Sequence, residues 1–160
     1  MSNKVVLGLG GNVGNVQNTL TKCIDLLSCK LGEVQLKSSL YKTKAWGVEN
    51  QPDFINQVIE IETDLSPTEC LTVCQNIEQE LGRVRQAKWH QRTIDIDVLF
   101  FNDEIINTPD LKIPHPFIQD RNFVLFPLAE ILPNYRHPKL KKTILELKNS
   151  CSDNLEAIKI

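Results

Sequence analysis

The stretch QVIEIETDLSPTECLTVCQNIEQELG, residues 57 to 82, contains a strand, a helix start and a helix end in one continuous run. Its opening part is rich in β-branched residues between turn-forming segments, which predicts a strand. Ser66 has the position of a helix cap, Pro67 the first helical position, and Glu69 completes a capping box. Gly82 marks the helix end. The apolar face between them repeats at helical spacing and comprises Cys70, Cys74, Ile77 and Leu81.

The segments on either side of this stretch extend the same alternation. Residues 4–9 form an apolar run that ends in a glycine-rich turn, and residues 16–31 have helical periodicity that stops at Gly32. Residues 34–41 and 93–101 have the composition of strands. The order is therefore β α β β α β. It predicts an α+β fold of the ferredoxin-like, split βαβ type, with a mainly antiparallel sheet and both helices on one face.

The chain continues past this core. We expect a short strand around Ile105, a helix over 123–131 and an amphipathic segment over 143–148. This C-terminal helical extension is too short to form another domain, so residues 1–160 are predicted to form one domain. The connection over 43–53 is long for a hairpin and is predicted to be a loop.

Composition limits the classes of function. The chain has 160 residues, 41% of them hydrophobic, and a formal net charge of −2. An acidic balance argues against nonspecific binding to nucleic acid or to anionic membranes. The sequence has neither a signal peptide's apolar core nor a membrane-spanning run, so we expect a cytoplasmic protein that binds neither nucleic acid nor membrane. The five cysteines include no C-x-x-C pair and are predicted to be reduced thiols, those of the second helix serving as core.

Two aspartates stand at the start of the strand over 93–101. Side chains alternate along a strand, so Asp95 and Asp97 share one face, with α-carbons about 6.6 Å apart. Their mutual repulsion calls for a compensating positive charge, and Mg²⁺ prefers one or two carboxylates completed by water and phosphate oxygens. The alternative is a strand with one solvated face. Because residues 98–101 are continuously apolar, the pair stands where the strand becomes buried, which favours a metal site.

The loop before this strand is basic. Arg83, Arg85, Lys88 and Arg92 fall within it, and it contains no acidic residue. Such a cluster is either a solvated surface or a phosphate site. Beside a carboxylate pair the phosphate site is favoured, because cations and a metal together can surround a polyphosphate during transfer.

Four aromatic residues fall in or beside predicted loops. They are Trp46, Phe54, Trp89 and Phe123. Each alone is more typical of a core, but several beside a phosphate site indicate stacking on a flat heterocycle. The sequence contains no P-loop, and its glycine turn misses the dinucleotide-binding spacing, so the glycines are interpreted as structural.

Two other classes of function stay open at this point. Ferredoxin-like folds also serve as RNA-binding modules, although the strand signature of such modules is missing. The D-x-D pattern also occurs in Mg²⁺-dependent glycosyltransferases, although size and fold pattern oppose that class.

The sequence resembles the 6-hydroxymethyl-7,8-dihydropterin pyrophosphokinase family over essentially its whole length. The motifs that carry the resemblance are LGGNVGN near the start, QPDFIN at 51–56, GRVRQAKWHQRTIDIDVLFF at 82–101, IPHP at 113–116 and RNFVLFPLAEI at 121–131. The third is highly specific. The resemblance implies a ferredoxin-like fold and transfer of a pyrophosphoryl group from ATP to a pterin hydroxymethyl group in folate biosynthesis.

The resemblance also implies roles for individual residues. Catalysis would use Arg83, Arg92, Asp95 and Asp97, the two aspartates holding two Mg²⁺ ions with ATP. ATP would be bound by Gln75, Glu78, Arg85, Trp89, His115 and Arg121. The pterin would be bound by Thr43, Trp46, Phe54, Asn56 and Phe123. No residue is an evident general base, and we expect a monomer.

The chain departs from the family's usual pattern at three places. His90 and Gln91 stand where Gly-Pro is usual, Gly11 stands where serine is common, and Phe54 often appears as tyrosine. The first departure predicts a less rigid loop before Arg92.

Overall fold

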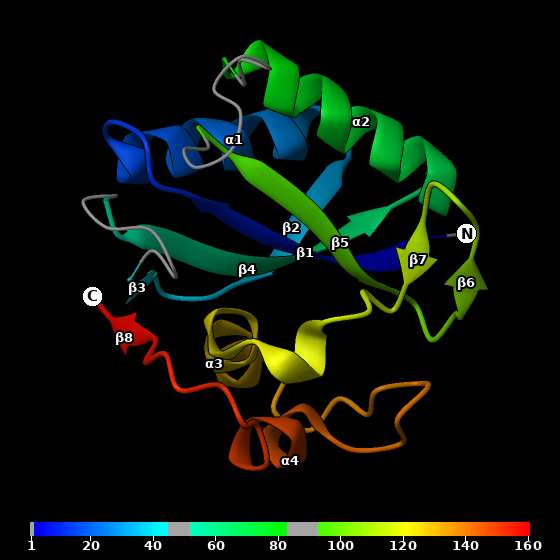
Figure 1. Ribbon diagram of the computed structural model, residues 1–160. Helices are drawn as coiled ribbons and strands as arrows, with labels where there is room; N and C mark the ends of the chain where they lie inside the picture. Colours follow the sequence, from blue (N-terminus) through cyan, green and yellow to red (C-terminus); the bar gives the residue numbers. More distant parts are fainter. Residues whose placement is uncertain (1, 45–51, 83–92) are drawn as a thin grey trace.

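The computed structural model describes residues 2–44, 52–82 and 93–160. Its main sheet has the strand order β5-β1-β4-β3-β8, with β2 also paired to β4, and every ladder is antiparallel (Figure 1). These strands are β1 (Asn3–Gly11), β2 (Gly32–Lys37), β3 (Tyr41–Thr43), β4 (Phe54–Thr63), β5 (Asp95–Phe101) and β8 (Ile158–Lys159). The two long central strands, β1 and β4, are thus flanked by β5 on one side and by β2 and β3 on the other.

Two helices cover one face of the sheet, α1 (Val16–Lys30) and α2 (Pro67–Glu80) (Figure 1). The predicted capping box of α2 is present, because the Ser66 side chain accepts from Glu69 N and the Glu69 side chain accepts from Ser66 N. Gly82 follows with φ +90°, a left-handed conformation that favours glycine. All five cysteines are free thiols, and those of α2 lie fully in the core, as predicted.

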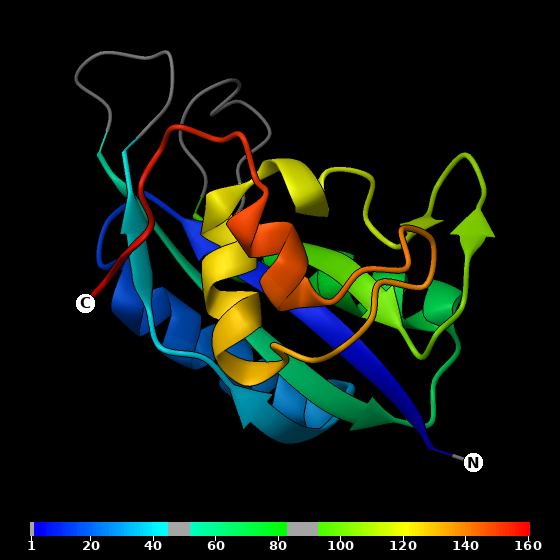
Figure 2. The ribbon, with the colours of Figure 1, turned by 90° about the horizontal axis from the view of Figure 1, so that it is seen from below.

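The opposite face is covered by the C-terminal part of the chain (Figure 2). It comprises the single turn η1 (Ile118–Asp120), then α3 (Asn122–Ile131) and α4 (Ile144–Asn149). A small hairpin of β6 (Ile106–Asn107) and β7 (Lys112–Ile113) precedes them. The predicted ferredoxin-like core with its C-terminal helical extension is therefore confirmed. None of the helices within the described ranges has the length and apolar composition that crossing a bilayer requires.

Two of the differences from the predicted element boundaries have an evident cause in the pairing of the strands. The first strand continues through the glycines to Gly11, because β4 pairs with it along its whole length. The single strand predicted over 34–41 is two strands, and the interruption is at Ser38. There the Ser38 side chain accepts from Val58 N at 3.0 Å, which replaces a regular ladder bond and shifts the register against β4 by one residue.

Candidate active site

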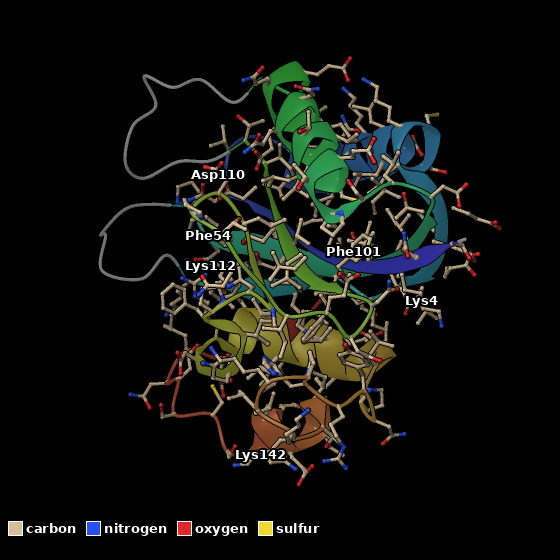
Figure 3. The ribbon with its side chains drawn as sticks, turned by 90° about the vertical axis from the view of Figure 1, so that its right-hand side faces the viewer. Lys4, Phe54, Phe101, Asp110, Lys112 and Lys142 are labelled. Atoms are coloured by element: carbon tan, nitrogen blue, oxygen red, sulfur yellow. The ribbon has the colours of Figure 1, made fainter. Side chains whose placement is uncertain are left out.

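A cavity of about 430 Å³ lies between the sheet and the N-terminal end of α3. Pockets of this size hold small organic ligands. Figure 3 shows Phe54 at one end of the sheet, with α1 and α2 on one side and α3 and α4 on the other. The cavity brings together seven of the predicted site residues: Thr43, Phe54, Asn56, Asp95, Asp97, Arg121 and Phe123.

The two aspartates both open into this cavity from β5. Their strand neighbours Ile96 and Val98 are buried against α1 and α2, so the predicted division of the strand into an acidic and an apolar face is confirmed. On β1 the cross-strand partners of Asp95 and Asp97 are glycines, which also line the cavity. Because these glycines have no side chain, the Leu99 and Asn56 side chains can pack directly over them beside the carboxylates.

The glycines of the first strand therefore do more than form a turn. Gly10 pairs with Asp95 on one side and with Asn56 on the other. A Cβ at residue 10 would collide with the side-chain oxygen of Asn56. Gly10 and Gly11, which the sequence predicts in a turn, are therefore strand residues, and the close packing of Asn56 over Gly10 agrees with a structural role for the glycines.

Asn56 lines the cavity and has a buried side-chain nitrogen. The residue is only 8% exposed, and its Nδ2 has no hydrogen-bond partner among the described residues. A buried amide donor without a partner costs free energy, and such groups are rare in folded proteins. A ligand carbonyl or ring nitrogen in the cavity would satisfy it.

Arg121 and Phe123 form the wall that α3 contributes. The Arg121 guanidinium lies 5.0 Å from the ring centroid of Phe117 and 5.5 Å from that of Phe123, within the range of cation–π attraction. Phe54 contributes a second aromatic ring from β4. The predicted residues that line the cavity thus include two carboxylates, two aromatic rings, a cation and an amide.

Three predicted ATP-site residues lie outside the set of described residues that line the cavity: Gln75, Glu78 and His115. Gln75 is exposed on α2. Glu78 is 7% exposed on the same helix, and its carboxylate accepts from Ile96 N, between the two aspartates, at 2.8 Å. His115 donates its backbone N–H to Leu99 O. Burial is the main cause that lowers the pKa of its imidazole; Asp97 opposes this shift and Arg121 adds to it.

The remaining predicted site residues lie outside the described residues. They are Trp46, Arg83, Arg85, Trp89 and Arg92, together with His90 and Gln91. Their roles stay predictions.

The cavity also includes residues that sequence reasoning missed. Besides the glycines of β1, they include Lys44, Asp120, Asp153 and Leu155. Asp120 directly precedes the recognised motif at 121–131, so its neighbourhood was a usable signal. Asp153 and Leu155 gave none, because only tertiary packing brings the end of the chain to this end of the sheet.

Comparison with known proteins gives consistent matches. The model of the family 7,8-dihydro-6-hydroxymethylpterin-pyrophosphokinase (HPPK) matches residues 6–133. A 2-amino-4-hydroxy-6-hydroxymethyldihydropteridine pyrophosphokinase of Aquifex aeolicus (strain VF5) is 45% identical, over 90% of this chain and 89% of the relative. The enzyme of the same name from Bacillus subtilis (strain 168) is 44% identical, over 82% of this chain and 79% of the relative.

Solved structures share the fold. The Plasmodium falciparum HPPK-DHPS wild type with pteroate superposes with a TM-score of 0.77 at 20% identity. The match covers 93% of this chain but only 44% of that chain, so the present chain spans less than half of the Plasmodium protein.

Proposed function

The chain belongs to the 7,8-dihydro-6-hydroxymethylpterin-pyrophosphokinase family, and on this premise we propose that it transfers a pyrophosphoryl group from ATP to 6-hydroxymethyl-7,8-dihydropterin. The products are the pterin diphosphate and AMP, and the reaction is a step of folate biosynthesis. The observation that carries the proposal is the opening of the Asp95 and Asp97 carboxylates into the same cavity as Phe54, Asn56 and Phe123. A phosphate-metal site and a heterocycle site in one cavity are what this transfer needs.

The ring end of the cavity suits a pterin. Such a ring is flat and carries hydrogen-bonding edges, so it needs apolar cover on its faces and a few polar partners at its rim. Phe54 and Phe123 supply the cover. The unsatisfied Nδ2 of Asn56 supplies a donor, and the buried hydroxyl of Thr43 lies in the same wall.

The acidic end suits Mg²⁺. We propose that Asp95 and Asp97, which both line the cavity, are the carboxylates that would hold the ion. Among residues 2–44, 52–82 and 93–160, no three His, Cys, Asp or Glu side chains gather into a metal-binding group. Mg²⁺ typically takes one or two carboxylates and completes its shell with water and phosphate oxygens. When bound, Mg²⁺ supplies charge neutralisation for the triphosphate.

The reaction requires alignment more than covalent catalysis. The hydroxymethyl oxygen bonds to the β-phosphorus of ATP, and the bond from that phosphorus to the oxygen bridging it to the α-phosphorus breaks. AMP keeps the bridging oxygen, and the hydroxyl proton passes to water. The task of the chain is to hold the alcohol in line and to stabilise the charge that moves. In this proposal Arg121, together with Arg83 and Arg92, provides the positive charge.

Substitution of the aspartates tests the proposal. Asp95→Asn and Asp97→Asn should each lower AMP release by at least about 100-fold, the scale of losing one charge-stabilising group in an active site. Asp64→Asn is the matched control, because Asp64 is exposed and follows β4 at the end opposite Phe54. Near-normal turnover in either aspartate variant, with the fold intact by circular dichroism, would contradict the proposed metal site.

We predict that the protein is a monomer and that it is cytoplasmic. Size-exclusion chromatography with light scattering measures the oligomeric state directly.

A further inference from the structure

Residues 151–160, the terminal segment, pass the cavity on their way back to the sheet. Asp153 and Leu155 of this segment line the cavity. Figures 1 and 2 show the segment leaving α4, running beside α3 and ending as β8 next to β3. The family match covers residues 6–133, so this part of the wall lies beyond it.

One anchor of the terminal segment is at the start of α3. Asn122 N donates to the Asp153 carboxylate at 2.9 Å, and Asn122 Nδ2 donates to the carbonyl oxygens of Asp153 at 3.1 Å and of Leu155 at 2.9 Å. Asp153 also accepts from Leu155 N at 2.9 Å, which fixes the turn between them. Because Asn122 directly precedes Phe123, the segment and the aromatic wall are held in one unit.

The other anchor is at the edge of the sheet. Lys159 and Ile158 pair with Tyr41 and Lys42, and Ile160 N donates to Leu40 O at 3.0 Å. Thr43, a cavity residue, comes next along β3. Leu155 is therefore held between two cavity walls, one on α3 and one on β3.

We propose that Leu155 is a specificity-determining residue for the pterin, covering part of the ring's apolar surface, and that Asp153 is a positioning residue that holds it there. This inference rests on the proposed function. Leu155 is half-buried, so part of its side chain is available to a ligand. The carboxylate of Asp153 is engaged with two backbone N–H groups and so acts on the ligand through Asn122 and Leu155.

Equilibrium binding separates this role from a purely structural one. The probe is 6-hydroxymethylpterin, titrated by fluorescence in the presence of Mg²⁺ and a nonhydrolysable ATP analogue. Leu155→Ala should weaken pterin binding by about tenfold, the scale of shortening a side chain in an apolar pocket. Leu155→Met conserves volume and should bind within about twofold of wild type. Asn154→Ala, at the exposed neighbouring position, is the matched control and should bind like wild type.

A second pair of measurements tests the part played by Asp153. Asp153→Ala removes the cap on Asn122 N and should weaken pterin binding by roughly fivefold, the equivalent of a lost helix cap. The Kd of the ATP analogue should change less than twofold in Leu155→Ala and in Asp153→Ala.

Two results would overturn the inference. One is a pterin Kd for Leu155→Ala that equals the Kd of wild type. The other is an equal loss of pterin and nucleotide affinity together with a lowered Tm, which would make the segment a structural anchor only. If wild type binds the pterin and forms AMP while Leu155→Ala matches it, the inference alone fails. If wild type itself neither binds the pterin nor forms AMP, the proposed function fails and this inference with it.

Discussion

Replacing Asn56 by leucine should make the unliganded protein more stable and its binding of the pterin weaker. The side-chain nitrogen of Asn56 is a buried donor without a partner among the described residues. Leucine has nearly the same shape and has no polar group to desolvate. Removing an unsatisfied buried donor relieves a cost of about 1–3 kcal/mol. Taking the low end, Tm should rise by roughly 2–4 °C, as expected for a chain of this length.

The effect on binding has the opposite sign. In the variant, the pterin acceptor that meets Asn56 would lose its water and face a methyl group instead. Leaving such a group unsatisfied costs about 1–3 kcal/mol, which corresponds to a roughly 5- to 150-fold higher Kd. The prediction is therefore a higher Tm together with a higher pterin Kd. A general loss of packing would lower the Tm and so does not produce this combination.

Thermal unfolding without ligand and fluorescence titration of 6-hydroxymethylpterin measure the two shifts on the same preparations. Asn154→Leu is the control, because it makes the same chemical change at an exposed site in the terminal segment. A lower Tm combined with unchanged pterin affinity would contradict this prediction, since it would mean that the amide serves the fold and not a ligand.

Three further predictions concern the scaffold. Ser66→Ala removes the capping box of α2 and should lower stability by about 1 kcal/mol in urea unfolding, with AMP release unchanged. Burial alone would raise the pKa of Glu130, but hydrogen bonds from Ser39 and Tyr41 hold it below its usual range. The stability advantage of wild type over Glu130→Gln should therefore be present above the unfolded pKa of about 4.3 and disappear as the pH falls through the lower folded value. At pH 8 a thiol reagent should modify exposed Cys29 rapidly, whereas unfolding should be needed for the core thiols. Burial raises the pKa of two core thiols, that of Cys23 to about 12 and that of Cys70 to about 11.

The sequence predicts those features of the fold that depend on residues close together in the chain. The capping residues of α2, the glycine after it and the alternation along β5 are each specified within a few residues, and all three predictions are confirmed. The break between β2 and β3 could not be read in the same way. It depends on a Ser38 hydroxyl that meets Val58, twenty positions away, and serine at that position has no unique local meaning.

In the candidate site, too, some features are specified by local sequence and others depend on long-range packing. The acidic pair was visible because two aspartates at a strand start conflict with strand propensity. The sequence predicts Gly10 in a turn because glycine usually interrupts a strand, whereas its place between Asp95 and Asn56 depends on which residues the sheet pairs with it. Leu155 reaches the cavity through pairing of β8 with β3, which a two-residue strand does not signal in sequence.

The most direct test of the account follows the fate of the phosphoryl groups. Protein, ATP, Mg²⁺ and 6-hydroxymethyl-7,8-dihydropterin are mixed, and the products are resolved by phosphorus NMR and chromatography. A cavity that joins an acidic metal site to a pterin site predicts AMP and pterin diphosphate in equal amounts, with both lost when Mg²⁺ is omitted. ADP with a pterin monophosphate, or ATP consumption that does not depend on the pterin, would contradict it.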